Sequence, residues 1–200
     1  LRNAHSAGHS ADYVLFDTWF SSPAQLIAVK NLGLDSIAMI KKSSRIYYEY
    51  EGEQLSIKKI FGICKKRRGR SKYLLSVNVM VGKEKLPAKI VCVRNKKNKK
   101  YWIAFICTNP ELSEEEIIRI YGKRWQIEVF FKTCKSYLNL ISECHSLTYD
   151  ALTAHVAIVF TRYLMIAMEQ RRNEDDRTLG EIFYFFTDEL SDISFGESFQ

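Results

Sequence analysis

Paired cysteines, metal-ligand clusters and long apolar runs are all missing from this chain of 200 residues. Its five cysteines show no C-x-x-C pair and no spacing with histidine that would hold zinc. Such cysteines are typical of free thiols in a reducing cytosol. No apolar run reaches the roughly 18 residues of a membrane span, and no signal peptide opens the chain. We therefore expect neither a zinc site nor a membrane partner.

Positive charge is what the chain has in excess, with a formal net charge of +7. It gathers in two runs, KKRRGRSK at Lys65–Lys72 and RNKKNKK at Arg94–Lys100. A basic surface of this kind attracts polyanions, of which nucleic acid is the most common. The alternative is that each run is a solvated hairpin turn in an ordinary basic protein. Both interpretations stay open at this point.

The order of predicted elements favours an α/β fold. A short apolar strand ends at Asp17, PAQLIAVKNLG reads as a helix closed by Gly33, and SIAMIK reads as a strand, which together favour parallel pairing. The segments that follow are β-rich and predict an antiparallel insertion. The predicted divisions are a core part with Asp17, the β-rich insertion, core helices with Glu128, and a helical and charged tail: 1–42, 43–109, 110–172 and 173–200.

A capping box at Ser113–Glu116 predicts a helix that runs to about Lys135. At about 100° per residue, such a helix places four residues of a Y-x2-R-x3-E-x6-K pattern within an arc of roughly 60°. These four are Tyr121, Arg124, Glu128 and Lys135. The apolar residues expected on the adjoining, core-facing arc are Ile120, Ile127, Phe131 and Cys134.

A plainer interpretation of this stripe is a solvated helix face. Arg124, Glu128 and Lys132 are spaced to form i,i+4 ion pairs, each worth only about 0.2–0.5 kcal/mol. The surrounding sequence favours a functional interpretation instead.

The run YGKRWQIEVFFKTCK resembles the signature of bacterial insertion-sequence transposases of the insertion-sequence-four-like family, which is named for the four letters of the pattern. Upstream, ADYVLFDTWFSSP resembles the strand that carries that family's second catalytic aspartate, here Asp17. The resemblance implies an RNase H-like catalytic core, incomplete here, interrupted by the β insertion and followed by C-terminal helices. It also implies DNA transposition by cleavage and transfer of phosphodiester bonds.

The resemblance further implies two divalent cations, Mg²⁺ or Mn²⁺, held by three carboxylates. One cation activates the attacking water or 3′-hydroxyl and the other stabilises the leaving oxygen. Asp17 and Glu128 would be the second and third of these ligands. Carboxylates suit Mg²⁺ because it is a hard ion that prefers oxygen.

The remaining candidate residues are DNA contacts. The resemblance implies phosphate contacts for Tyr121, Arg124 and Lys135, and base capture for Trp102, which matches only by approximate distance. Trp125 is expected either to stack on DNA or to be a core aromatic. The basic run would hold DNA without reading its sequence, through Lys65, Lys66, Arg67 and Arg68.

The chain departs from the family at the first aspartate, for which the sixteen residues before Asp17 offer no match. The chain also starts at Leu1 without a methionine, so we expect a C-terminal fragment of the catalytic domain, inactive by itself. The complete protein is expected to act as a homodimer on double-stranded DNA, in the bacterial cytoplasm at the nucleoid. Two alternatives remain: a truncated remnant that at most binds DNA, and an unrelated α/β protein whose basic hairpins bind RNA.

Overall fold

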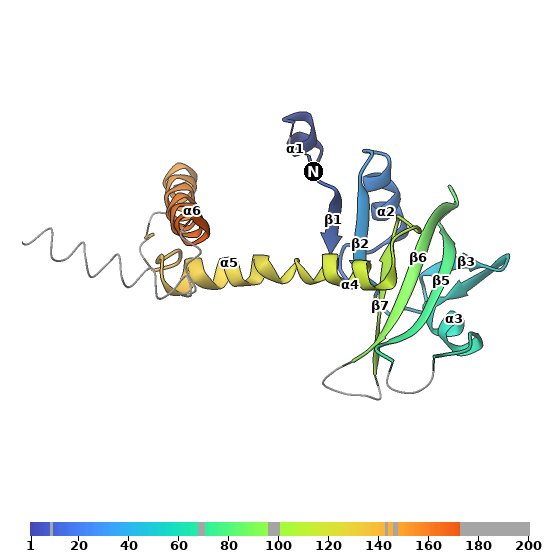
Figure 1. Cartoon of the computed structure of the whole chain (residues 1–200). Helices are drawn as coiled ribbons and strands as arrows, with labels where there is room; N and C mark the ends of the chain where they lie inside the picture. Colours follow the sequence, from blue (N-terminus) through green and yellow to red (C-terminus); the bar gives the residue numbers. More distant parts are fainter. Residues whose placement is uncertain (9, 68–70, 96–100, 143, 146–147, 173–200) are drawn as a thin grey trace, which may run out of the picture. The chain divides into compact units, whose positions relative to one another are not determined.

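A computed structural model describes residues 1–8, 10–67, 71–95, 101–142, 144–145 and 148–172 (Figure 1). The chain divides into two compact units, unit 1 up to Arg124 and unit 2 from Trp125. The elements of unit 1 are α1 (Arg2–Ser6), β1 (Tyr13–Phe16), α2 (Pro23–Lys30), β2 (Asp35–Met39), β3 (Tyr47–Tyr50), β4 (Glu53–Ser56), α3 (Ile57–Ile63), β5 (Tyr73–Val81), β6 (Leu86–Arg94), β7 (Trp102–Cys107) and α4 (Glu114–Gly122). Those of unit 2 are α5 (Trp125–Ser136) and α6 (Tyr149–Arg172).

Unit 1 is built on one seven-stranded sheet with the order β1-β2-β7-β6-β5-β3-β4. Strands β1 and β2 pair in parallel, joined by α2, and every other pairing is antiparallel. The predicted strand–helix–strand unit is therefore confirmed, and so is the mixed α/β class. The RNase H-like assignment is compatible with this sheet and stays a prediction.

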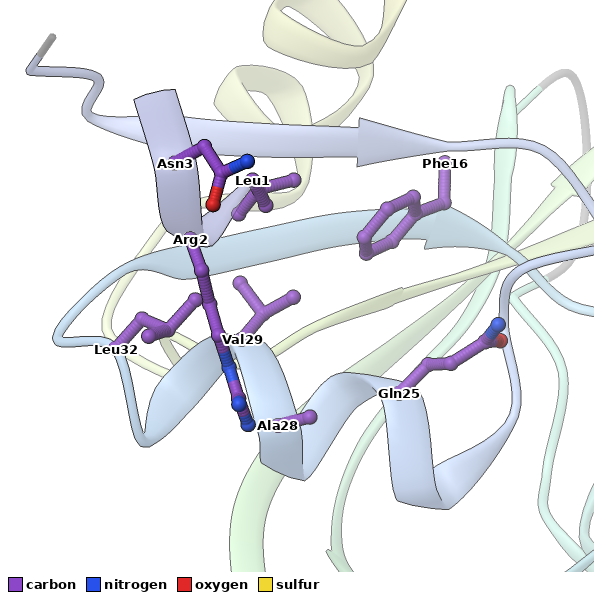
Figure 2. Close-up of a pocket in the computed structure, with 8 residues that line it drawn as sticks. All are labelled: Leu1, Arg2, Asn3, Phe16, Gln25, Ala28, Val29 and Leu32. Carbon is purple, nitrogen blue, oxygen red and sulfur yellow. The ribbon is translucent and has the colours of Figure 1, made fainter. Parts of the chain in front are cut away.

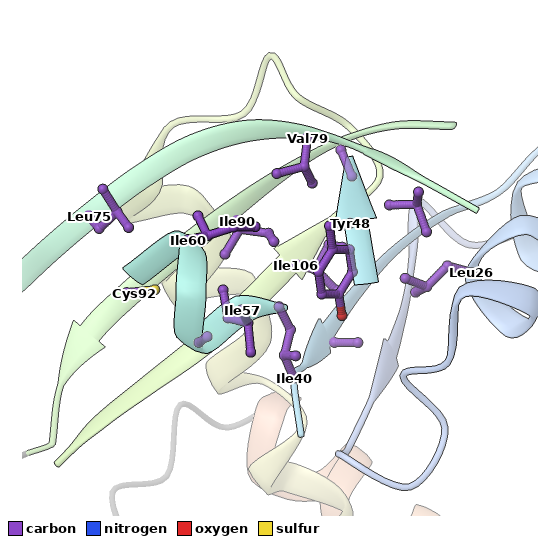
Figure 3. Close-up of a cluster of buried hydrophobic side chains, with 14 of the residues drawn as sticks. Leu26, Ile40, Tyr48, Ile57, Ile60, Leu75, Val79, Ile90, Cys92 and Ile106 are labelled. Atoms are coloured by element: carbon purple, nitrogen blue, oxygen red, sulfur yellow. The ribbon is translucent and has the colours of Figure 1, made fainter. Parts of the chain in front are cut away.

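Both faces of the sheet are buried because the central strands carry apolar residues on both sides, and successive side chains point to opposite faces. Ala104 and Ile106 of β7 face a first cluster with α2 and α3, whereas Phe105 and Cys107 face a second cluster with α4. Figure 3 shows side chains of the first cluster converging between α3 and the strands. Full burial of an aliphatic side chain such as Ile106 contributes about 1.5–3 kcal/mol.

The antiparallel strands predicted within 43–109 are confirmed by their registers. They continue the sheet that begins with β1 and β2, and the insertion and the other predicted divisions stay predictions. Strand β4 was missed, because three of the four residues of Glu53–Ser56 are polar and the strand lacks a clear alternation. The tail 173–200 and the tip of the β6–β7 hairpin lie outside the described residues.

The single helix predicted from Ser113 to Lys135 is wrong. The capping box at Ser113 and Glu116 is present, but α4 ends at Gly122 and a new helix begins at Trp125. Lys123 and Arg124 form a tight turn between them, in which each backbone N–H donates to the carbonyl oxygen three residues earlier. The four residues Tyr121, Arg124, Glu128 and Lys135 are therefore not carried by one continuous helix.

The expected core-facing arc of that helix is also wrong in part. Cys134 is buried in unit 2, where α5 and α6 pack together around Phe130 and Val159. Ile127 and Phe131, in contrast, are exposed. The helical period was counted across the turn at Lys123 and Arg124, where the regular helix is interrupted.

The helix predicted from Asp150 to Arg171 is confirmed as α6. In the part of the chain that the structure describes, α6 is long and apolar enough to cross a membrane, by length and composition alone. Its most apolar window has a mean hydropathy of 1.6, and 6% of that window is buried. The count of uninterrupted apolar runs missed this helix because Thr153, His155 and Thr161 interrupt it. The absence of a membrane partner stays a prediction.

Candidate functional site

Asp17 lies directly after β1, at the edge where the carboxyl ends of the parallel strands β1 and β2 meet. Its side chain is half-buried, and its Oδ1 accepts a hydrogen bond of 2.8 Å from the backbone N–H of Trp19. This bond fixes the carboxylate at the strand end and leaves acceptor capacity for a cation or a phosphate-bound water.

Two residues beside Asp17 were missed by sequence reasoning. Trp19 is 80% exposed, and the Nζ atom of Lys41, beyond the end of β2, lies 5.5 Å from the centroid of its ring. An exposed tryptophan can stack on a nucleic-acid base, and a lysine beside it can contact a phosphate. The sequence alone does not reveal its exposure, because WF after a buried strand reads equally well as core.

Glu128 lies in the first turn of α5 in unit 2, where its side chain is exposed. Lys135, in the last turn of the same helix, is also exposed. Trp125 opens the helix and is 63% exposed, so the described residues do not bury it as a core aromatic. These three predicted site residues thus lie on one helix with their side chains accessible.

The two candidate carboxylates belong to different compact units, Asp17 to unit 1 and Glu128 to unit 2. Within the described ranges, no group of three or more His, Cys, Asp or Glu side chains is placed to hold a metal ion. Carboxylate oxygens are nevertheless the donors that Mg²⁺ prefers, so the chemistry of both residues fits that ion. A third carboxylate is needed to complete a two-metal site of the predicted kind.

Tyr121 and Arg124 end unit 1. Tyr121 is only 8% exposed, and its ring centroid lies 4.7 Å from that of Phe105 in the second core cluster. The guanidinium carbon of Arg124 lies 5.9 Å from the Tyr121 ring. Tyr121 therefore anchors α4 to the sheet, and Arg124 is half-buried beside it.

Trp102 opens β7 and packs on the edge of the first core cluster. Its ring stacks on Phe61 with the centroids 4.1 Å apart and 12° between the planes, and Lys42 Nζ lies 4.0 Å from its centroid. A captured base would have to displace one of these neighbours. Base capture by Trp102 stays a prediction.

The sheet register brings the two basic runs to the same end of the β5–β6–β7 meander. Arg94 pairs with Trp102 across the strands, and its backbone N–H donates to the carbonyl of Lys72 at 3.0 Å. Lys65 and Lys66 precede β5 at this end. Arg68 lies outside the described residues.

Among the described residues of the first run, Arg67 forms an ion pair with a carboxylate. Its guanidinium donates to both carboxylate oxygens of Glu114, the first residue of α4. The hydrogen bonds and negative charge of Glu114 raise the pKa of Arg67 above its ordinary value. The ion pair uses two of the five N–H donors of Arg67 and neutralises its charge, so its loss would make the whole guanidinium available to a phosphate.

A pocket of about 420 Å³ lies between α1, β1 and α2 (Figure 2). Its lining is mostly apolar and holds no acidic side chain. Asp17 is not part of it, although Phe16, the preceding residue, points into it. This pocket is therefore not a metal site.

Comparison with known proteins gives one finding on the family. A family model described as Transposase DDE domain matches residues 1–165, which include Asp17 and Glu128. No curated protein matches the chain.

Proposed function

Because the chain belongs to the transposase DDE domain family, we propose that it carries two of the three catalytic carboxylates for cutting and joining DNA at transposon ends. The proposed subgroup is the insertion-sequence-four-like one, on the pattern of Tyr121, Arg124, Glu128 and Lys135. The observation that carries the proposal is the family match across residues 1–165, which takes in both carboxylates. The match also removes the alternative of an unrelated RNA-binding α/β protein.

Asp17 and Glu128 are proposed to hold Mg²⁺ or Mn²⁺ together with an aspartate that no residue of this chain matches. When bound, the metal ions would activate the attacking oxygen and stabilise the leaving one. Asp17 presents its carboxylate from the end of β1, oriented by the N–H of Trp19. Glu128 presents its carboxylate from an exposed helix face with Lys135 about two turns further on.

DNA is the proposed substrate and partner. Exposed Trp19, Trp125 and Lys135 offer stacking surfaces and charge near the two carboxylates in sequence. The basic runs at the end of the meander offer contacts to the DNA backbone that do not depend on base sequence. Action as a homodimer, at the bacterial nucleoid in the cytoplasm, belongs to the same proposal.

The test compares Asp17→Asn and Glu128→Gln in the full-length protein that contains these residues. The substrate is a supercoiled plasmid with the transposon ends, incubated with Mg²⁺ or Mn²⁺. We expect both variants to lose nicking while they retain DNA binding in a mobility-shift assay. Asp12→Asn removes an exposed carboxylate five residues before Asp17 and should cleave like the unmodified protein.

Persistent nicking by Asp17→Asn or Glu128→Gln would refute the assignment. A full-length protein that binds the ends but never nicks them would favour the second candidate, a remnant that only binds DNA. We expect the 200-residue chain alone to bind DNA without cleaving it, since the matching third carboxylate is absent.

A further inference from the structure

A layered cluster of two aromatic rings and two lysines lies beside α3 in unit 1. Phe61 and Trp102 stack nearly parallel, with 12° between the rings and 4.1 Å between their centroids. Lys42 Nζ lies 4.0 Å from the Trp102 centroid, and Lys66 Nζ lies 4.9 Å from the Phe61 centroid. The inner face of each ring is covered by the other ring, so each lysine lies over the outer face of its own ring.

A third lysine adds to the positive charge. Lys58 precedes Phe61 by three residues on α3, so the two side chains are neighbours on the surface of that helix. Burial lowers the pKa of Lys42, Cys92 opposes this shift, and the positive charge of Lys58 adds to it. In the described part of the chain, the lysines that form ion pairs with carboxylates are Lys30 and Lys85. Lys42, Lys58 and Lys66 therefore lie together without a carboxylate partner among the described residues.

The fold holds this cluster in place. Lys66 Nζ donates to the carbonyl of Gly62 at 3.1 Å, which ties it to the end of α3. Ile57 and Ile60 bury the inner side of α3 in the first core cluster (Figure 3). Lys58 is exposed. Three like charges held on a rigid base repel one another, and a polyanion relieves that repulsion.

The cluster is continuous with the basic end of the meander. Trp102 is paired across the strands with Arg94, whose N–H donates to the Lys72 carbonyl. Sequence reasoning recognised Lys66 within a basic run, whereas Lys42 and Lys58 stand in separate, less basic segments. Only the fold brings the three together.

We propose that Lys42, Lys58 and Lys66 form a phosphate-binding track for DNA, with the Phe61–Trp102 stack as its rigid support. This inference rests on the proposed function for the identity of the polyanion. In this arrangement Trp102 holds cations in position and does not need to capture a base. The track contacts the DNA backbone and is indifferent to base sequence.

The test is a salt titration of DNA binding by the 200-residue chain, followed by the fluorescence anisotropy of a labelled DNA duplex. Each lost phosphate contact lowers the slope of log affinity against log salt by about 0.9. We expect this loss in Lys42→Gln, Lys58→Gln and Lys66→Gln, roughly additively in the triple variant. Lys83→Gln removes the same charge from the turn at the opposite end of the β5–β6 hairpin and should leave the slope unchanged.

Two further measurements separate the track from a merely structural cluster. Lys42→Arg keeps the charge and the ring contact and should retain the slope of the unmodified chain. Thermal unfolding of each glutamine variant checks that the fold is intact. Slopes equal to that of Lys83→Gln in folded variants would overturn the proposal, as would preference of the track for an RNA duplex over DNA.

The outcome is independent of the cleavage test. A normal salt slope in the lysine variants refutes the track even where Asp17→Asn abolishes nicking. Nicking that survives Glu128→Gln refutes the proposed function even where the lysine variants lose their phosphate contacts.

Discussion

Replacing Glu114 with glutamine should strengthen DNA binding, because it releases Arg67. In the folded chain Arg67 donates to both oxygens of the Glu114 carboxylate, and this pair holds the basic segment before β5 against the start of α4. Glutamine offers one acceptor oxygen and no charge, so the guanidinium becomes available to a phosphate. The pair is largely at the surface, with 52% of the Arg67 side chain exposed, and its loss should cost at most about 1 kcal/mol of stability.

The magnitude follows from counterion release. One added phosphate contact steepens the slope of log affinity against log salt by about 0.9. Over a fourfold rise in salt concentration, the affinity of the variant should therefore fall by a factor about 3.5 times larger than that of the unmodified chain. The assay is the anisotropy titration described above, at salt concentrations from low to physiological. Glu115→Gln is the matched control, since it removes the same charge from the next residue of α4, which forms no ion pair with any described residue.

Equal slopes for Glu114→Gln and Glu115→Gln would refute the reasoning. They would mean that Arg67 does not reach DNA even when it is free, or that only the overall charge matters. Weaker binding by Glu114→Gln would mean that the ion pair itself positions the basic segment for DNA.

Two predictions concern stability. Tyr48→Phe should raise the free energy of unfolding by about 1 kcal/mol in urea denaturation, because the Tyr48 hydroxyl is fully buried with no hydrogen-bond partner among the described residues; a clear loss of stability would show that the hydroxyl has a partner. Gly82→Ala should lower the stability of the fold more than Gly33→Ala does, because a Cβ at Gly82 would lie 2.6 Å from Cδ1 of Ile27. Gly33 has open space around it, so Gly33→Ala should cost only the roughly 1–2 kcal/mol of a left-handed backbone. Equal melting temperatures for the two variants would contradict that contact.

The sheet could be predicted largely from the sequence because its strands are apolar and well separated. YLLSVNVMV became β5 over its whole length, and the strand before Asp17 became β1. The order of the strands could not be predicted, since it depends on pairings such as that of β2 with β7, far apart in the chain. Local patterns carry no information on such partners.

The helix break between Gly122 and Trp125 illustrates a second limit. Glu115 to Lys135 contains no proline, and its one glycine, Gly122, is a residue that helices often tolerate, although α4 ends there. Tyr121 is held by Phe105, and this tertiary contact belongs to unit 1, whereas α5 packs on α6 in unit 2. The ends of the helices are thus set by packing partners that the sequence does not reveal.

The role of Asp17 in the candidate site stays a proposal, but its place at the end of a strand was predictable. The cluster of Lys42, Lys58 and Lys66 was not, because its members come from three segments that only tertiary folding joins. Runs of basic residues reveal clusters whose members are adjacent in the sequence and miss clusters whose members come from separate segments.

The burial of Tyr121 bears on how mutants of this chain are to be interpreted genetically. A tyrosine that belongs to the proposed Y-x2-R-x3-E-x6-K signature is an obvious target in a screen for transposition-defective alleles. Here its ring packs against Phe105, so truncation to alanine would remove core packing worth about 3–5 kcal/mol. The transposition defect of such an allele would then reflect a low abundance of folded protein. Only Tyr121→Phe would isolate what the hydroxyl of Tyr121 does.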